Sequence, residues 1–368
     1  MKKVYVDLAE RKYPIMIGQG VVATAGPLLK SLEFTQAPIV VSNARVWRLH
    51  GSTLMRSLQQ EYGRVPVIHI GDGERYKNHS TLMKIYRGMF RAHADRGSWV
   101  LAFGGGVVGD IAGFAAATFM RGIPCVMAPT TLLSQVDSSI GGKVGINVAE
   151  GKNLIGAFHQ PAAVLTDPEV LKTLPKRELV SGLQEIIKSA AIRSKSLLRY
   201  LERNLPAILA CESQQMEHIV GEAAKIKAEV VSLDEKEGGL RTILNFGHTI
   251  GHAFETATDY RRFKHGEAVA WGMIAALEYG KELGMMDSGE ADRLAQLVHR
   301  TGRLPSLQGI SLRDLWSALA RDKKFLAGDI RMVLLRNPGE AEIQSRIDPV
   351  SLKRFLKSFL SANTAGRT

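Results

Sequence analysis

The sequence predicts an α/β domain over residues 1–177, followed by a mainly α-helical domain over residues 178–368. Three observations support this prediction. The chain has 368 residues, 45% of them hydrophobic, which is enough for two cores. In the first part, short apolar runs alternate with helix-length segments, as in a parallel sheet with covered faces. After Asp167-Pro168 the pattern changes to helical periodicity with few strand-like runs.

The expected strands of the first domain are short apolar runs bounded by turn residues. Val4–Val6 and Tyr13–Ile17 flank a charged turn and predict an opening hairpin. Further runs follow at 38–41, 65–70, 99–103, 125–128 and 164–165. Because ligands of open parallel sheets bind beyond the carboxyl ends of the strands, we expect site residues directly after these runs.

Two segments after expected strands resemble dinucleotide-binding turns. Residues 104–110 read Gly-Gly-Gly-Val-Val-Gly-Asp and have the G-x-G-x-x-G spacing between a strand and a helix. The acidic residue expected about twenty positions later is absent, so a tight structural turn remains the alternative. In residues 71–77, Glu74 and Lys77 could meet a ribose or an adenine edge, although the sequence alone favours a solvated loop.

The stretch 121–161 is unusually rich in glycine and polar side chains. Asp137, Lys143, Lys152 and Asn153 are interleaved with glycines there, which predicts loops whose backbone approaches a ligand. A phosphate or a carboxylate suits such cations and amides. Ordinary surface turns are the alternative, but the density of polar residues favours a binding site.

The second domain is expected to consist of helices. Their periodic segments are 178–202, 215–232, 266–284, 289–301 and 311–320. In the first of them, Glu185 and Lys188 are three positions apart, and this spacing by itself predicts a surface ion pair.

Three of the ten histidines lie within eighteen residues, at positions 248, 252 and 265. In a helix, His248 and His252 share one face, so spacing alone nominates these two as metal ligands or as an acid–base pair. Hydrogen-bonded core histidines are the alternative. Thr249 stands where the catalytic Glu of an H-E-x-x-H protease would be, which excludes that class.

Composition narrows the classes of partner. The net charge is +12, but the basic residues are spread over both halves without an arginine-rich arm, so we expect an anionic small molecule rather than nucleic acid. The two cysteines, Cys125 and Cys211, indicate buried thiols in a reducing compartment, that is, the cytoplasm. No apolar run predicts a signal peptide or a membrane span.

Over essentially its whole length, the chain resembles the 3-dehydroquinate synthase family of sugar phosphate cyclases. The resemblance rests on long blocks of sequence: Gly104–Asp110, Arg121-Gly122, Pro129–Leu133, Gln135–Lys143, Gly151–Asn153, Glu185-x-x-Lys188, Asp234-Glu235, Leu244–His252, His265–Val269 and Asp322–Lys324. It implies a dehydroquinate synthase-like fold, with a Rossmann-like α/β domain before the helical one.

The resemblance also implies an activity. A carbon–oxygen lyase of the shikimate pathway would convert 3-deoxy-D-arabino-heptulosonate 7-phosphate into 3-dehydroquinate and phosphate, as a homodimer. NAD⁺ would be reduced and reoxidised within each turnover, giving oxidation, β-elimination, reduction and aldol closure. Zinc or cobalt would polarise the substrate oxygens.

Residue by residue, the resemblance implies four sets of site residues. The metal ligands are Glu185, His248 and His265. The catalytic residues are His252, Lys188, Asp137, Arg241 and Asn245. The other substrate-binding residues are Arg121, which reaches the neighbouring subunit, with Lys143, Asn153, Lys227 and Lys324. The NAD-binding residues are Glu74, Lys77, Gly104, Gly105, Gly106, Asp110, Thr130, Thr131, Lys143 and Lys152.

Some positions depart from the family pattern. Residues 42–45 read Ser-Asn-Ala-Arg where an acid and an amide usually bind the adenosine ribose, so the contacts of Asn43 and Arg45 stay open. A cyclase acting on another sugar phosphate is the nearest alternative activity, and a polyol dehydrogenase with net turnover of NAD is a more distant one. Arg241 and Lys227 favour the synthesis of 3-dehydroquinate over both alternatives, because each could bind the carboxylate of the heptulosonate substrate.

Overall fold

The computed structural model describes residues 1–9, 11–320 and 330–364. Its contacts divide the chain into two compact units. The first comprises Met1–Pro175 and Cys211–Lys236, and the second comprises Lys176–Ala210 and Glu237–Thr368. The division expected at residues 177 and 178 differs from this grouping mainly in the segment 211–236, which belongs to the first unit.

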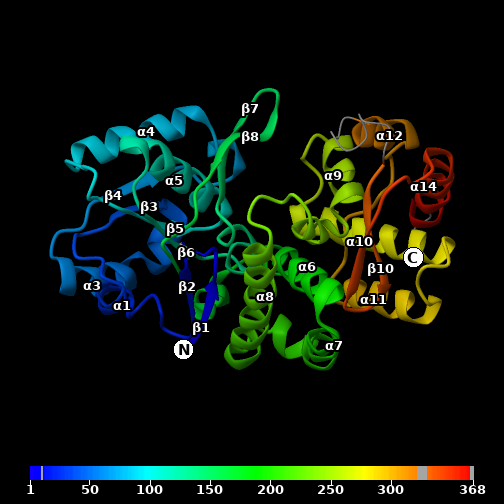
Figure 1. Cartoon of the computed structure of the whole chain (residues 1–368), viewed down its shortest axis with the longest axis horizontal. Helices are drawn as coiled ribbons and strands as arrows, with labels where there is room; N and C mark the ends of the chain where they lie inside the picture. Colours follow the sequence, from blue (N-terminus) through cyan, green and yellow to red (C-terminus); the bar gives the residue numbers. More distant parts are fainter. Residues whose placement is uncertain (10, 321–329, 365–368) are drawn as a thin grey trace. The chain divides into compact units, whose positions relative to one another are not determined.

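The first unit is built on a seven-stranded sheet with the order β1-β2-β9-β6-β5-β3-β4 (Figure 1). β1 and β2 pair antiparallel and the other neighbours pair parallel, which confirms the predicted hairpin and the predicted parallel sheet. The strands are β1 (Lys2–Val6), β2 (Tyr13–Ile17), β3 (Ile39–Asn43), β4 (Val67–Ile70), β5 (Val100–Gly104), β6 (Cys125–Pro129) and β9 (Ala163–Thr166).

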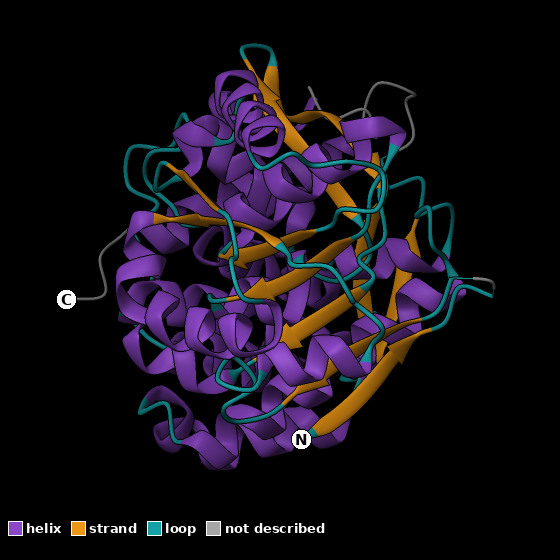
Figure 2. Cartoon of the chain, turned by 90° about the vertical axis from the view of Figure 1, so that its left-hand side faces the viewer, coloured by secondary structure: helices purple, strands orange, loops and turns teal. Residues whose placement is uncertain are grey.

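Helices cover the sheet (Figure 2). Every residue of β3, β5, β6 and β9 is buried, which explains why these strands read as continuous apolar runs rather than alternating ones. Phe103 and Val126 belong to the core cluster. The helices are α1 (Ala25–Ser31), α2 (Ala44–Val46), α3 (Ser52–Tyr62), α4 (His79–Arg91), α5 (Gly106–Thr118) and α8 (Ser213–Leu233), with short helical turns at Trp47–Gly51, Glu74–Tyr76, Phe119–Arg121, Ser134–Ser138 and Pro168–Thr173.

Helix α8 is held to the first unit at both ends. At its start, Ser213 donates a hydrogen bond to Glu169. Near its end, Ser232 Oγ accepts a hydrogen bond from the backbone N–H of Asp7 at 2.9 Å. Sequence periodicity showed that this segment is helical, but it could not show which domain the helix packs against.

Residues 143–158 form an antiparallel hairpin of β7 (Lys143–Val148) and β8 (Gly151–Phe158). The prediction of loops was therefore wrong over these residues. Gly145 pairs with Gly156, and a Cβ on Gly156 would lie 2.2 Å from the carbonyl oxygen of Val144. The glycines at this pair serve close approach between two strands.

The second unit is mainly helical. The predicted segment 178–202 is divided at Ser194, whose side chain accepts a hydrogen bond from Leu197 N at 3.2 Å and caps the next helix. The sequence did not predict the β-hairpin or the last helix. The elements are α6 (Lys176–Arg193), α7 (Lys195–Leu209), a helical turn at Leu240–Asn245, α9 (His248–Ala257), α10 (His265–Glu282), α11 (Ser288–Arg300), α12 (Leu312–Ala320), β10 (Met332–Asn337), β11 (Glu340–Gln344) and α14 (Pro349–Thr364).

Two glycines bring α10 into close contact with its neighbours. A Cβ on Gly266 would lie 1.9 Å from the carbonyl oxygen of Ser181 in α6, and one on Gly272 would lie 1.8 Å from that of Gly247 before α9. No larger side chain fits either contact. α6 and α9 therefore pack directly against the backbone of α10.

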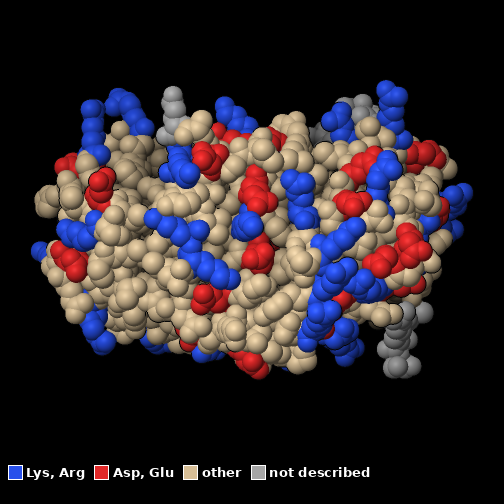
Figure 3. Space-filling view, turned by 60° about the horizontal axis from the view of Figure 1, so that its bottom comes forward, with Lys and Arg blue, Asp and Glu red and all other residues tan. Residues whose placement is uncertain are grey.

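Charge is mixed on the face of the molecule drawn in Figure 3. Figure 3 shows a face on which Lys and Arg side chains lie among Asp and Glu side chains. Such mixing is typical of a solvated surface rather than a nucleic-acid interface. Among the described helices, none has the length and apolar composition of a membrane span.

Candidate active site

The glycine motif lies at the start of α5. β5 ends at Gly104 and α5 begins at Gly106, so the predicted strand–turn–helix context is present. Cβ atoms on Gly104 and Gly105 would lie 2.5 Å from Val108 and 2.9 Å from Thr131, which explains the need for glycine. No side chain caps this helix, so its first amides suit an anionic group.

Two hydroxyl groups near this turn lack partners. Thr130 is 5% exposed, and its backbone N–H donates to the carbonyl oxygen of Gly104 at 2.9 Å. Neither Thr130 Oγ1 nor Ser138 Oγ has a hydrogen-bond partner among the residues that the structure describes. Buried hydroxyls seldom stay unpaired, so this arrangement fits a polar ligand such as a dinucleotide.

Lys77 joins two other residues of the first unit that the sequence nominated. Its ammonium pairs with the Asp110 carboxylate and donates to Asn153 Oδ1, while its side chain is only 5% exposed. The interpretation of a solvated loop is therefore wrong for Lys77. Burial raises the pKa of the Asp110 carboxyl, and Lys77 opposes that rise.

Sequence reasoning missed Asn147, which lies in the same polar group. Its side chain donates to Glu74 Oε1 at 2.7 Å and accepts from Asn153 N at 2.9 Å. Its backbone N–H donates to the carbonyl oxygen of Lys77 at 2.8 Å. Glu74, Lys77 and Asn147 also line a cavity of about 660 Å³. The one available signal was its position between Lys143 and Asn153.

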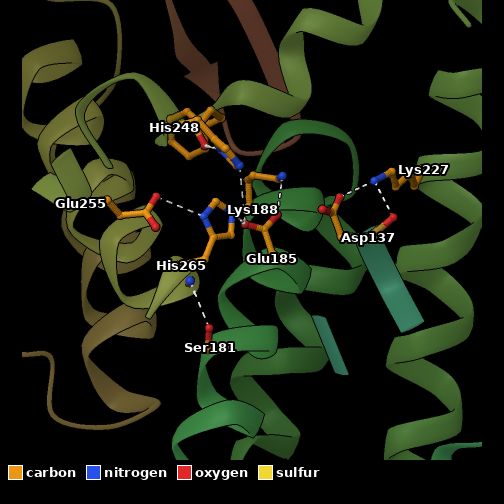
Figure 4. Close-up of polar contacts among 10 residues, drawn as sticks. Asp137, Ser181, Glu185, Lys188, Lys227, His248, Glu255 and His265 are labelled. Carbon is orange, nitrogen blue, oxygen red and sulfur yellow. Dashed lines mark hydrogen bonds and ion pairs between the residues drawn. The ribbon is translucent and has the colours of Figure 1, made fainter. Parts of the chain in front are cut away.

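Lys227 and Asp137 form a second pair in the first unit (Figure 4). Lys227 Nζ pairs with the Asp137 carboxylate and donates to the Asp137 carbonyl oxygen at 2.7 Å. The Lys227 side chain is 9% exposed. Two predicted substrate residues, 90 positions apart, are thereby brought together.

In the second unit, Glu185 and Lys188 form a buried ion pair on α6. Their side chains are 1% and 3% exposed, so the surface pair predicted from spacing is wrong. Apart from this ion pair, neither oxygen of Glu185 accepts a hydrogen bond from any described residue.

The three histidines lie together, and two of them face Glu185. One ring nitrogen from each of His248, His252 and His265 lies within 4.8 Å of the others. Glu185 Oε1 lies 3.8 Å from His248 Nε2 and 3.6 Å from His265 Nε2 (Figure 4). α9 begins at His248 and α10 at His265, so the close packing of α10 positions both rings.

The outer ring nitrogens have acceptors. His248 Nδ1 lies 3.2 Å from the carbonyl oxygen of Phe246, and His265 Nδ1 lies 3.4 Å from Glu255 Oε2. An N–H on each Nδ1 leaves the Nε2 lone pair directed at Glu185. Sequence reasoning missed Glu255, although it follows His248 and His252 on one helix face at i+7 and i+3.

This arrangement fits a divalent metal. A carboxylate that is buried without hydrogen bonds is costly unless an ion binds it. Burial lowers the pKa of His248 well below 6.5, and the charges of Lys188 and the neighbouring histidines lower it further, so the ring is neutral as ligation requires. One carboxylate and two or three imidazoles are ligands typical of zinc.

Arg241 and Asn245 lie on the helical turn before α9. Arg241 is 3% exposed. Asn245 Nδ2 donates to Glu237 Oε1 at 2.8 Å, and Glu237 has a positive φ of 61°. Sequence reasoning did not single out Glu237, and a lone Glu in a loop gives no periodic signal.

Two of the remaining predicted residues, Arg121 and Lys143, are exposed. Arg121 is exposed at a positive φ of 72°, next to Met120 at 49°. Lys143 is exposed and Lys152 is half-buried, both on the β7–β8 hairpin. Lys324 lies outside the described residues.

The chain is similar in sequence to known proteins over most of its length. Two family models, described as 3-dehydroquinate synthase N-terminal and C-terminal, match residues 67–181 and 182–325. A 3-dehydroquinate synthase of Symbiobacterium thermophilum is 43% identical over 96% of this chain and 99% of its own length. One from Pelotomaculum thermopropionicum is 44% identical over 98% of this chain and 97% of its own length.

Solved structures share the fold over nearly the whole chain. A 2-deoxy-scyllo-inosose synthase complexed with carbaglucose-6-phosphate, NAD⁺ and Co²⁺ has a TM-score of 0.88 and 25% identity, covering 97% of this chain and 99% of that one. A 2-epi-5-epi-valiolone synthase from Streptomyces hygroscopicus subsp. jinggangensis, with NAD⁺ and Zn²⁺ bound, has a TM-score of 0.85 and 28% identity, covering 95% and 97%.

Replacing Lys77 with Met should destabilise the fold more at neutral than at acidic pH. Burial already raises the folded-state pKa of Asp110 above its ordinary 3.8, so stability linked to this carboxyl is present at low pH and is lost as pH rises through the folded pKa. Without Lys77 that pKa rises further, and the loss at about pH 7.5 should be about 2 kcal/mol. Urea unfolding at about pH 5 and about pH 7.5 measures it.

The double variant Lys77→Met/Asp110→Asn is the control, because it removes the charge that Lys77 balances. The double variant should lose no more stability at neutral pH than at acidic pH. If the double variant keeps the full pH dependence of the single variant, the pairing with Asp110 does not cause it.

Proposed function

The chain belongs to the 3-dehydroquinate synthase family, and we propose which of its residues carry the reaction. It is an enzyme of the shikimate pathway that converts 3-deoxy-D-arabino-heptulosonate 7-phosphate into 3-dehydroquinate and phosphate. Because phosphate leaves by elimination from carbon, we class it as a carbon–oxygen lyase. The group formed by the buried Glu185 and the half-buried His248 and His265 is the observation that carries our assignment of the catalytic centre.

NAD and a divalent metal are the cofactors, as in the two solved relatives. Bound NAD⁺ accepts a hydride and returns it within one turnover, so no net oxidation occurs. The uncapped start of α5 and the unpaired Thr130 hydroxyl support pyrophosphate binding there. The residues that we assign to NAD are Glu74, Lys77, Gly104, Gly105, Gly106, Asp110, Thr130, Thr131, Lys143 and Lys152.

We assign Glu185, His248 and His265 as the metal ligands, and zinc or cobalt as the metal. A bound ion of this kind polarises substrate oxygens. The protein prepares the ligands: the Phe246 carbonyl and the Glu255 carboxylate each accept a hydrogen bond from Nδ1 of one ring and so fix its tautomer and orientation.

His252 has a different role in this proposal. It is exposed, whereas His248 and His265 are half-buried. Its ring centroid lies 5.1 Å from that of His248, within one helical turn. An exposed imidazole beside the ligands can take up or donate a proton at a substrate hydroxyl, since its ordinary pKa lies near neutral pH.

The substrate is an anionic sugar phosphate. Buried lysine and arginine side chains bind it in this proposal. Lys188, Lys227 and Arg241 are 2%, 7% and 3% exposed. Charges attract anions more strongly there than on an open surface. The other residues that we assign to the substrate are Asp137, Asn245, Arg121, Lys143, Asn153 and Lys324.

We propose that the enzyme is a homodimer through the β7–β8 hairpin and the neighbourhood of Arg121. Leu154, Ile155 and Phe158 are 58%, 47% and 48% exposed, and Met120 is 40% exposed. A group of exposed large apolar side chains is typical of a protein interface. A second copy would cover them and bring Arg121 to the partner's substrate.

A cytoplasmic location agrees with the cysteines. Cys125 and Cys211 are free thiols. Burial raises the pKa of Cys125 to about 12, so that thiol is unreactive. Neither thiol contributes to a disulfide framework, and a reducing compartment suits such a protein.

Phosphate release tests the proposed chemistry. The purified protein with NAD⁺ and Zn²⁺ or Co²⁺ should release phosphate from the heptulosonate phosphate without accumulation of NADH. Steady formation of NADH would indicate a polyol dehydrogenase. Turnover only with sugar phosphates that lack a carboxylate would indicate another cyclase.

The two histidines of α9 should respond differently to replacement by Ala. His248→Ala removes a ligand, so metal content measured after dialysis should fall. His252→Ala should retain the metal and lower the turnover number by about a hundredfold or more, because a proton-transfer group is lost. The opposite pattern would reverse the two roles.

The proposed interface predicts that Ile155→Lys weakens the dimer. A lysine there would place a charge in an apolar contact, so sedimentation equilibrium should show monomers at concentrations where the unmodified protein is dimeric. Leu283→Lys, at a position 43% exposed in the other unit, is the matched control and should stay dimeric. A monomeric unmodified protein would contradict the proposal.

A further inference from the structure

The first residue of α10 is His265, and α6 holds the backbone around it at two points. We propose that Arg177 and Glu267 form a clamp that positions His265 for metal binding, with Arg177 as a positioning residue that touches neither substrate nor metal. This inference rests on the proposed role of His265 as a ligand, and it concerns residues that spacing and resemblance did not nominate.

The clamp is bidentate. Arg177 Nε lies 2.6 Å from Glu267 Oε1, and one terminal nitrogen of Arg177 lies 2.7 Å from Glu267 Oε2. That terminal nitrogen also donates to the carbonyl oxygen of Arg262 at 3.0 Å. Two parallel hydrogen bonds between charged groups fix orientation as well as distance. The guanidinium therefore ties Glu267 to the loop that leads into α10.

Glu267 also binds the backbone of Lys264, the residue before His265. Its Oε2 accepts a hydrogen bond from the backbone N–H of Lys264 at 2.7 Å. Glu267 is the third residue of α10, so its side chain folds back over the first turn and satisfies a donor that the helix leaves open. The backbone on both sides of His265 is thereby fixed.

A second contact starts from the same face of α6. Ser181 Oγ accepts a hydrogen bond from the backbone N–H of Gly266 at 3.0 Å (Figure 4). Arg177, Ser181 and Glu185 follow one another at intervals of four residues, so they share one side of α6. One face of α6 thus carries the proposed ligand Glu185 and both contacts that hold the backbone around His265.

Burial shows why Arg177 matters to Glu267. The Glu267 side chain is 6% exposed, whereas that of Arg177 is 53% exposed. A cavity of about 430 Å³, lined by both residues, adjoins the clamp. If Arg177 is shortened, the Glu267 carboxylate loses its charged partner beside this cavity, so we expect the start of α10 to shift while the unit stays folded.

A small shift is enough to affect metal binding. Glu185 Oε1 and His265 Nε2 lie 3.6 Å apart on different helices. Metal–ligand distances vary by only about 0.2 Å in functional sites. A displacement of His265 that barely changes packing would therefore weaken coordination.

The experiment compares two arginines that make similar pairs. Arg293 binds Glu202 with Nε–Oε1 and terminal N–Oε2 distances of 2.7 and 3.0 Å, and so links α11 to α7. Its other partner among the described residues is Glu290, in α11 itself. The variants are Arg177→Ala, Arg177→Lys and the control Arg293→Ala. For each, Zn²⁺ and Co²⁺ affinity is measured by chelator competition, the Co²⁺ visible spectrum is recorded, and the melting temperature of the metal-free protein is determined.

Arg177→Ala should weaken Zn²⁺ and Co²⁺ binding by about ten- to a hundredfold and alter the Co²⁺ spectrum. Arg177→Lys should recover part of the affinity, because it restores a charge but not the bidentate geometry. Arg293→Ala should bind both metals like the unmodified protein, even if the melting temperature of its metal-free form falls as much as that of Arg177→Ala.

Unchanged metal affinity in Arg177→Ala, or an equal loss in Arg293→Ala, would overturn the clamp. His265→Ala separates that result from a failure of the proposed function. If His265→Ala lowers metal affinity and Arg177→Ala does not, the clamp is wrong and the ligand assignment stands. If His265→Ala leaves metal affinity unchanged, both are overturned.

Discussion

The burial of the Glu185 carboxylate is the constraint on which the proposed catalytic centre depends. Its side chain is 1% exposed and pairs with Lys188, yet its oxygens accept no hydrogen bond from the residues described. Removing a charged group from water costs free energy unless an opposite charge and hydrogen bonds replace the solvent. A bound divalent ion would supply that compensation, which explains why two imidazole nitrogens face the same oxygen. The three helices that meet at this point pack through Gly266 and Gly272, so the fold by itself holds these side chains close together.

The first unit brings its polar residues together by another route. Parallel strands end at one edge of the sheet, and the segments that follow them carry Gly104, Thr130 and Lys77. Lys77 then links separate segments, because one ammonium contacts both Asp110 and Asn153. The pair of Lys227 and Asp137 shows that α8 contributes a cation to this unit. In this unit, buried charges are paired by residues far apart in sequence, which couples the stability of the fold to the arrangement of these side chains.

Local sequence patterns predicted much of the architecture. The hairpin of β1 and β2, the parallel strands and the main helices follow from runs of apolar residues and their periods, because those patterns report which faces are buried. The glycine turn before α5 was also found, since its spacing is local. The β7–β8 hairpin was missed because its glycines resemble loop glycines, and the pairing of Gly145 with Gly156 appears only when the two strands meet. The break at Ser194 was missed because the periodicity continues across the cap.

The sequence by itself determined the fold class, the family resemblance and the residue types of the site, because these depend on local order and on recognisable blocks. Only the tertiary structure decided that Glu185 and Lys188 are buried, that α8 belongs to the first unit, that Glu255 lies beside the His265 ring and that Arg177 pairs with Glu267. Burial and pairing depend on contacts between segments separated by tens of residues. A linear pattern contains no distance between such segments, and it therefore could not distinguish a surface ion pair from a buried one.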